Sequence, residues 1–442
     1  MYRFIEHELQ KWKQASHRKP LIVRGARQVG KTYSILEFGR KSFDGNVYHI
    51  DLEKRPDLHP IFEPNLDVKR ILSDLEIALQ IRIVPGNDLL FFDEIQACPR
   101  ALMALRYFYE ELPQLHVIAA GSLLEFTFKD FSFPVGRIQF LEMYPMSFIE
   151  FLLATGNEAA IKIIFDRSLQ ITPTAHKIIL EWCKKYFFVG GMPECVNVFK
   201  ETQKFSEVRE VQQQLIQTYQ ADFSKYASRA NPQLLTTVLT NSARSVGEQV
   251  KYERLAEGFS NPTKKNALQL LAKARLVQKI PAVSIPQIPL GANAKENKFK
   301  LLFLDIGLMQ TLLGVRISEE YYKHDLLAMY QGKLAEQFVG QELLAYANAP
   351  LYYWRRAAKS STAEVDFLFE RETTVVPVEV KRGPAGRLKS LHLLLEAYPH
   401  IPQAYVVSSA PEGELPEQRL KFLPFYRIAA YFAPEEWKAL ML

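Results

Sequence analysis

Short apolar runs alternate with amphipathic stretches in the first third of the chain. The apolar runs predict four strands, at Pro20–Val23, Val47–Asp51, Asp88–Phe92 and His116–Ala120. The stretches between and after them predict helices over residues 32–42, 69–81 and 100–112. Strands that are apolar throughout and are separated by helices are typical of a buried parallel sheet with helices on both faces. The predicted fold class of this part is therefore α/β.

The pattern changes near Pro145. Residues 146–228 are mostly helical in pattern, with a break at Gly190-Gly191-Met192-Pro193. Residues 233–280 show three short helical patterns that end in a strand at 276–280, an order that suggests a winged helix-turn-helix. Prolines and polar residues over 281–300 predict a linker or a wing.

A strong amphipathic helix over 332–347 opens the last section of the chain. Strand patterns follow at 351–355, 363–370, 374–381 and 403–408, with a helix predicted over 386–397. These elements predict a separate α/β domain. We accordingly divide the chain into residues 1–145, 146–228, 229–300 and 301–442.

Composition and charge narrow the class of protein. A formal net charge of +6 over 442 residues permits a nucleic-acid partner without requiring one. The polar N-terminus lacks the apolar stretch of a signal peptide, and no run of eighteen apolar residues predicts a membrane span. Three cysteines without metal spacing fit a reducing compartment, so we expect a cytoplasmic protein.

The first candidate site is a glycine-rich turn between a strand and a helix. It contains the residues Gly25, Ala26, Arg27, Gln28, Val29, Gly30, Lys31 and Thr32. Glycines at this spacing let backbone N–H groups point at phosphates, and the helix N-terminus adds a favourable potential for the anion. We expect Lys31 to reach the β- and γ-phosphates of ATP and Thr32 to ligate Mg²⁺.

A second signal is the apolar strand that ends in Asp93 and Glu94. We expect Asp93 to hold the Mg²⁺ shell and Glu94 to act as the base that polarises the attacking water. Ser122 follows the next strand, where its hydroxyl can orient the water or the γ-phosphate; the alternative is a helix-capping serine. Arg137 lies past the fourth strand. It acts either as an arginine finger on a neighbouring subunit's γ-phosphate, which implies a homo-oligomer, or as an ordinary surface arginine.

These motifs resemble those of a family of prokaryotic AAA-type ATPases that carry a C-terminal domain of unknown function. The resemblance includes the two nucleotide motifs, the Gly136-Arg137 pair, the segment Tyr144–Phe148 and the turn Gly190–Glu194. It covers nearly the whole chain and implies an AAA core, a helical lid, a winged helix and an α/β tail. It implies no substrate.

The tail carries a second constellation. Asp366 lies on a strand, and Glu379 and Lys381 lie on one face of a later strand, because side chains alternate along a strand. These three residues resemble the core of the PD-(D/E)XK nuclease fold, with Glu336 matching its helix glutamate. The resemblance implies a divalent metal held by the carboxylates, with the lysine steadying the water or the transition-state charge. The alternative is a hairpin with scattered charges.

Two sets of basic residues are candidates for contact with phosphates. One set accompanies the tail constellation and contains Arg355, Arg356, Lys359, Arg382, Arg387 and Lys389. The other, Lys264, Lys265 and Lys273, lies on or near the recognition helix of the predicted winged helix. A solvated charged face is the alternative for the first set, and a protein-binding role is the alternative for the winged helix.

The sequence therefore predicts an ATP- and Mg²⁺-dependent AAA-type ATPase that couples its nucleotide state to DNA binding or remodelling. Two alternatives stay open. One is a metal-dependent nuclease gated by ATP, and the other is a nucleotide switch whose winged helix and tail bind protein partners.

Overall fold

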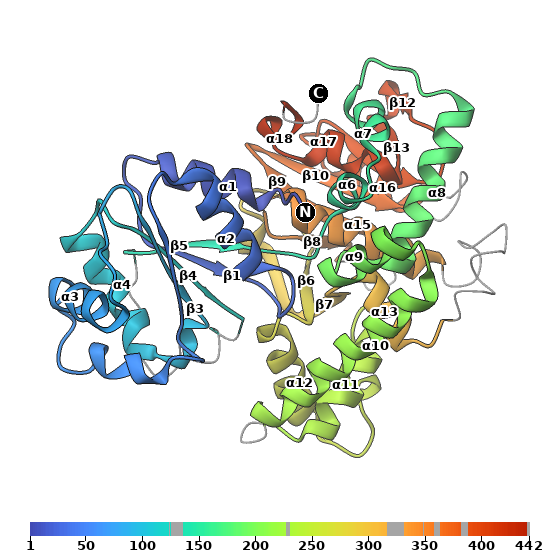
Figure 1. The fold of residues 1–442 in the computed structure, drawn as a ribbon. Helices are drawn as coiled ribbons and strands as arrows, with labels where there is room; N and C mark the ends of the chain where they lie inside the picture. The colour runs from blue at the N-terminus through green and yellow to red at the C-terminus, as the bar shows by residue number, and fades with distance from the viewer. Residues whose placement is uncertain are drawn as a thin grey trace. The chain divides into compact units, whose positions relative to one another are not determined.

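The computed structural model describes residues 1–122, 124, 136–226, 230–315, 331–347, 349–357, 363–381 and 388–439. The chain forms two compact units, one spanning Tyr2–Tyr144 and one spanning Pro145–Leu442 (Figure 1). None of the helices in the described part of the chain combines the length and the apolar character needed to cross a lipid bilayer.

A five-stranded parallel sheet forms the centre of the N-terminal unit. Its strands lie in the order β2-β3-β4-β1-β5. Their bounds are β1 Leu21–Arg24, β2 Val47–Asp51, β3 Leu89–Asp93, β4 His116–Gly121 and β5 Gln139–Glu142. Every residue of β3 and β4 is buried, as the apolar runs predict. The parallel α/β class expected from the sequence is thus present.

Helices cover both faces of this sheet. Helices α1 and α2 lie on one face, and α3 and α4 lie on the other (Figure 1). The bounds are α1 Ile5–Gln14, α2 Lys31–Ser42, α3 Val68–Leu79 and α4 Pro99–Glu111, with 3-10 turns at Pro56–Phe62 and Ile95–Ala97. The Asp67 carboxylate accepts from the N–H groups of Lys69 and Arg70 and so caps α3. Pro99 starts α4 at a position where no N–H is needed.

The predicted elements of this unit agree with the structure to within two residues at each end, but one strand was missed. Strand β5 has only four residues, and Gln139 and Phe140 on it are exposed. Its pattern is too short and too polar to stand out from a loop. It pairs with β1, so that β1 lies between β4 and β5.

The C-terminal unit contains many helices, of which α6 to α12 precede its first strand. They are α6 Phe148–Ala154, α7 Glu158–Phe165, α8 Pro173–Val189, α9 Pro193–Thr202, α10 Phe205–Asp222, α11 Pro232–Arg244, α12 Asn261–Lys273, α13 Ile306–Leu312, α15 Gln331–Tyr346, α16 Lys389–Ala397, α17 Ile428–Phe432 and α18 Glu435–Ala439. The break between α8 and α9 is the Gly190-Gly191 turn. A Cβ on Gly191 would lie 2.0 Å from the carbonyl oxygen of Met146, so only glycine fits this close approach. The Gly191 N–H donates to the buried carboxylate of Asp305 at 2.6 Å.

An eight-stranded mixed sheet forms the rest of this unit. Its order is β12-β13-β11-β10-β9-β8-β6-β7. The bounds are β6 Val277–Val283, β7 Ala294–Phe303, β8 Tyr352–Arg355, β9 Glu364–Arg371, β10 Thr374–Val380, β11 Ala404–Ser408, β12 Gly413–Leu415 and β13 Leu420–Pro424. Strands β10, β11 and β13 run parallel to one another, whereas β8, β9 and β10 are antiparallel neighbours.

Strand β7 was not predicted, and it changes the organisation expected around residue 300. The linker or wing predicted over 281–300 contains the end of β6 and most of β7, which pair as an antiparallel hairpin. Residues 295–298 are exposed and polar and resemble a loop, while the buried half of the strand begins at Phe299. Strand β6 also pairs with β8, so the hairpin continues the C-terminal sheet.

Glu342 on α15 is a buried carboxyl whose protonation is linked to folding. Its Oε1 accepts from the Phe148 N–H at 3.0 Å. Burial raises the pKa of Glu342 to about 8, and the hydrogen bond from Phe148 only partly opposes this. Between pH of about 4.5 and 8 the folded chain therefore holds a proton that the unfolded chain has lost. The free energy of unfolding falls as pH rises through this window, by at most about 1.4 kcal/mol per pH unit.

We expect the variant Glu342→Gln to remove this pH dependence. Its amide keeps the oxygen that Phe148 donates to and does not titrate. Thermal melting from pH 5 to 8.5 should show the melting temperature of the variant rising relative to wild type by several °C as the pH increases. The exposed Glu158→Gln serves as the matched control. A difference in melting temperature between the variant and wild type that does not change with pH would contradict the raised pKa of Glu342.

Candidate nucleotide-binding site

The glycine-rich turn connects the end of β1 to the start of α2. Two residues of the turn adopt positive φ, Gln28 at 61° and Gly30 at 95°, and Gly30 is the N-cap of α2. A Cβ on Gly25 would lie 2.3 Å from the carbonyl oxygen of Met143, which precludes any larger residue there. Together these glycines allow the chain to curl tightly around the N-terminus of α2, the geometry that binds phosphate.

Lys31 is the first residue of α2 and is buried. Its Nζ donates to the carbonyl oxygens of Gly25 at 3.1 Å and of Ala26 at 2.8 Å. The ammonium therefore lies inside the turn, where a phosphate group would enter. A phosphate oxygen is a stronger acceptor for an ammonium than a neutral carbonyl is, because the bond is then between opposite charges.

Thr32 and Asp93 meet across the neighbouring elements. The Thr32 hydroxyl donates to the Asp93 carboxylate at 2.7 Å, and the ring nitrogen Nε2 of His49 lies 3.2 Å from the same oxygen. Burial acts to raise the pKa of Asp93, but hydrogen bonds from His49, Thr32 and the Glu94 N–H outweigh it and hold the pKa below its usual value. Asp93 is thus an ionised carboxylate beside a hydroxyl.

This pair fits a Mg²⁺ ion that arrives with a nucleotide. Mg²⁺ prefers oxygen ligands and is usually held by one or two protein groups together with water and substrate phosphates. Thr32 and Asp93 supply two such groups at the end of the glycine-rich turn. Within the described ranges, no cluster of three or more His, Cys, Asp and Glu side chains is arranged to hold a metal. Thr32 and Asp93 would not need further protein ligands, because water and the nucleotide phosphates would complete the coordination of Mg²⁺.

Glu94 adopts a backbone conformation that is uncommon for its residue type. Strand β3 ends at Asp93, one residue after the end of the predicted range Asp88–Phe92, and Glu94 follows with φ 46° and ψ 43° in the left-handed region. The strain of such a conformation is of order 1 kcal/mol and is often found at functional sites. The Glu94 carboxylate accepts a hydrogen bond from Nε2 of Gln96.

Ser122 and Arg27 contact each other in the middle of the candidate site. Strand β4 lies between β1 and β3 in the sheet, so Ser122, just after β4, follows the strand that separates the two motifs. The Arg27 Nε donates to the buried Ser122 hydroxyl at 3.3 Å. Arg137 lies just before β5, and its side chain is 43% exposed and pairs with Glu110 at 2.8 Å.

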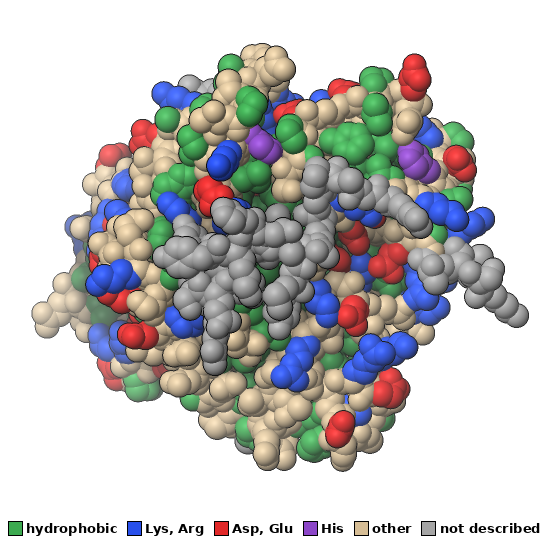
Figure 2. All heavy atoms as spheres, turned by 90° about the vertical axis from the view of Figure 1, so that its right-hand side faces the viewer, with side chains coloured by type: hydrophobic (Ala, Val, Ile, Leu, Met, Phe, Trp, Pro, Cys, Tyr) green, Lys and Arg blue, Asp and Glu red, His purple; other side chains and the backbone are tan. Residues whose placement is uncertain are grey.

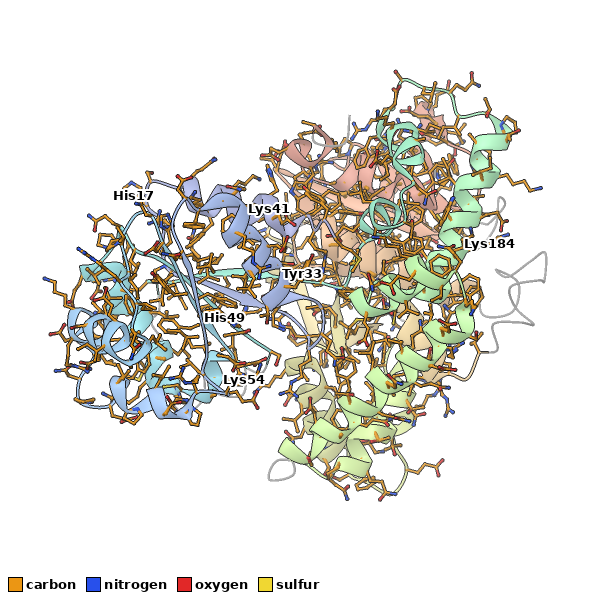
Figure 3. All side chains as sticks on the ribbon, in the orientation of Figure 1. His17, Tyr33, Lys41, His49, Lys54 and Lys184 are labelled. Carbon is orange, nitrogen blue, oxygen red and sulfur yellow. The ribbon has the colours of Figure 1, made fainter. Side chains whose placement is uncertain are left out.

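His49 is a residue of the site that the sequence analysis missed. It lies on β2 (Figure 3), opposite Phe91 of β3 in the parallel register. The His49 ring stacks on the Phe91 ring with centroids 4.9 Å apart. The signal was present in the alternation Val47, His49, Asp51. Residues at this spacing face the same side of a strand, and the neighbouring strand carries Asp93.

The predicted tail residues lie near one another but contact a residue that was not predicted. One Asp366 oxygen accepts from the Val380 N–H at 2.8 Å, and Lys381 Nζ lies 2.6 Å from Glu379. Glu336 and Asp366 contact the ammonium of Lys300, on β7, at 2.9 and 3.2 Å. Burial raises the pKa of Glu336 to about 7 and that of Glu379 to about 8.

The basic residues near the tail and the winged helix do not form one described patch. Lys359, Arg382 and Arg387 lie outside the described residues. Lys264 is only 6% exposed and is thus unsuited to contact a phosphate backbone, whereas Lys265 on the same helix is exposed. Lysine and arginine side chains on the face drawn in Figure 2 are scattered among acidic and apolar ones.

The parallel sheet, the glycine-rich turn after β1 and the carboxylates at and just after the end of β3 define a P-loop nucleotide-binding fold in the N-terminal unit. Residues 17–152 match a family described as an AAA domain, which confirms the AAA part of the expected resemblance. Residues 180–319 and 331–428 match two domains of unknown function, DUF8612 and DUF4143. The nuclease-like interpretation of the tail and the winged helix stay predictions.

Solved structures with a similar arrangement are distant in sequence. The Holliday junction branch migration motor RuvB of Thermotoga maritima has 15% identity and a TM-score of 0.31, covering 63% of this chain and 89% of its own. Aeropyrum pernix ORC1 in complex with DNA has 11% identity, a TM-score of 0.28 and coverages of 72% and 92%. Aquifex aeolicus DnaA bound to AMPPCP has 13% identity, a TM-score of 0.26 and coverages of 61% and 87%.

These TM-scores lie below 0.5, so the similarity to these structures does not indicate what this chain binds or does. No curated protein matches its sequence.

Proposed function

We propose that this chain binds ATP with Mg²⁺ and hydrolyses it in the N-terminal unit. The observation that carries the proposal is the contact between Thr32 and Asp93, which joins the phosphate-binding turn to the carboxylate strand at 2.7 Å. Neither motif alone specifies hydrolysis. Brought together, they offer a phosphate cradle, a site for the metal and a carboxylate next to both.

Each residue of the site has a proposed role. The turn from Gly25 to Gly30 cradles the phosphates, and Lys31 exchanges its carbonyl partners for phosphate oxygens. Thr32 and Asp93 hold Mg²⁺, which supplies charge neutralisation at the phosphates. Glu94 accepts the proton of the attacking water, and Ser122 orients that water or the γ-phosphate.

Arg137 is proposed to act on the nucleotide of a neighbouring copy of the chain. Its guanidinium is more than one-third exposed and is held by a single described carboxylate, that of Glu110. An exposed pair of this kind contributes little stability, so the arginine can exchange Glu110 for a phosphate at small cost. The proposal implies that the active form is a homo-oligomer.

The second part of the proposal is that the ATPase acts on DNA. It is supported by two helices, α11 and α12, followed directly by the β6–β7 hairpin, the order of elements in a winged helix-turn-helix. Lys265 is exposed on α12. The alternative, a nucleotide switch that binds protein partners, uses the same elements, so an experiment has to separate them.

The separating experiment measures the ATPase rate with duplex DNA, single-stranded DNA, RNA and no nucleic acid. We expect duplex DNA to raise the rate, and its affinity to fall about tenfold or more between 50 and 200 mM salt as counterions are released. The variant Lys265→Ala should weaken binding, whereas the exposed Lys177→Ala on α8 should not. Equal rates under all conditions, with no duplex binding at low salt, would favour the protein-binding switch.

A further inference from the structure

Lys300 is the only lysine of β7 that is fully buried, with its side chain 2% exposed. Three carboxylates surround its ammonium, Glu336 at 2.9 Å, Glu364 at 2.7 Å and Asp366 at 3.2 Å. The Nζ atom also lies 5.4 Å from the centre of the Tyr353 ring. An ammonium has three N–H donors, so three carboxylate oxygens satisfy it completely.

The carboxylates come from two different elements. Glu336 lies on α15, and Glu364 and Asp366 lie two residues apart on one face of β9. Glu336 is buried, whereas the side chains of Asp366 and Glu364 are 17% and 30% exposed. The three negative charges repel one another, and a single ammonium offsets only part of that repulsion.

The resemblance of the tail to a nuclease places a divalent metal among Asp366, Glu379 and Glu336. The described geometry does not fit that metal. Lys300 contacts one oxygen of Asp366 and one of Glu336, and the other Asp366 oxygen accepts from the Val380 N–H. A divalent ion would need oxygens at about 2.0–2.6 Å, at the place where the ammonium lies. Two positive groups would then share one small buried volume.

Glu379 does not change this conclusion. One of its oxygens is paired with Lys381 at 2.6 Å, and the other is buried without a hydrogen-bond partner among the described residues. Glu379 therefore offers one unpaired oxygen, which is fewer than the set of oxygen ligands that a divalent ion takes.

We propose that Lys300 is a built-in cation that takes the place of the divalent metal in the tail. The β6–β7 hairpin carries this lysine into the acidic cluster and so locks the hairpin to α15 and β9. This inference is independent of ATP hydrolysis in the N-terminal unit, since none of its residues belongs to that unit.

The first test is a Mn²⁺ titration of the full-length chain without nucleotide, followed by electron paramagnetic resonance of the free ion. Wild type, Asp366→Asn and Glu379→Gln should bind equal amounts of Mn²⁺. If wild type binds about one additional Mn²⁺ per chain that Asp366→Asn loses, the proposal is overturned. This measurement needs no change at Lys300, so it stands even where a Lys300 variant fails to fold.

The second test compares Lys300→Met with Lys298→Met. Both lysines lie on β7, but Lys298 is exposed and falls in the stretch between Lys295 and Phe299 where the pairing with β6 is interrupted. Loss of the buried ammonium leaves the carboxylates uncompensated, so Lys300→Met should lower the melting temperature by about 5–10 °C. Added Mn²⁺ should restore part of that loss through a newly gained site. Equal melting temperatures for the two variants would overturn the proposal.

Discussion

Replacing Lys31 by alanine is expected to abolish tight ATP binding. The Lys31 ammonium is buried against the carbonyl oxygens of Gly25 and Ala26, so it already lies within the turn that would receive the phosphates. Alanine removes two charge-assisted hydrogen bonds of about 1.5–3 kcal/mol each, which corresponds to about 100-fold weaker binding or more. Calorimetric titration of MgATP into the full-length chain measures this loss directly.

The matched control is Lys41→Ala. Lys41 lies in the last turn of the same helix, α2, at the opposite end from Tyr33 and the phosphate-binding turn (Figure 3). It carries the same charge but pairs with Glu6 on the surface. We expect the Lys41→Ala chain to bind ATP with the same affinity as wild type. An Lys31→Ala chain that binds MgATP as tightly as the Lys41→Ala chain would rule out the phosphate-loop assignment.

The second large effect is expected for Glu94→Gln. The substitution keeps the size of the side chain and an oxygen to accept from Gln96, but it removes the basic carboxylate. ATP should still bind with nearly wild-type affinity, while the turnover number should fall by about 100- to 10,000-fold. Steady-state phosphate release together with an ATP titration separates the two quantities.

Glu372→Gln is a suitable control for this variant. Glu372 also has a left-handed backbone, with φ 54°, but it lies in the turn between β9 and β10 of the other unit. If glutamine lowers stability whenever it replaces a glutamate with a left-handed backbone, both variants should lose stability to a similar extent. Wild-type turnover in the Glu94→Gln chain would mean that another residue activates the water.

The candidate nucleotide site could be predicted because its motifs are local in sequence. A glycine-rich turn between an apolar strand and a helix places Gly25, Gly30 and Lys31 together within eight residues. The second motif lies more than sixty residues later, yet the buried strand that carries it is apolar at every position before Asp93. Local patterns as strong as these can be recognised without knowing which residues they contact in the folded chain.

The residues that were missed depend on contacts between strands. His49 contacts Asp93 only because β2 and β3 pair in one particular register. Lys300 meets Asp366 because β7 brings it into a cluster formed by α15 and β9, over a separation of 66 residues. The strand that carries Lys300 has four exposed polar residues at positions 295–298 and so resembles a loop. Pairing across such distances is set by tertiary packing, which periodicity along one segment does not encode.

Phosphate release by the wild-type full-length chain in MgATP is the most direct test of the central claim, ATP hydrolysis in the N-terminal unit. The account predicts steady release that stops when a chelator removes Mg²⁺ and that is lost in the Lys31→Ala chain. A folded wild-type chain that releases no phosphate, with or without nucleic acid, would contradict it. So would release that continues undiminished in the Lys31→Ala chain.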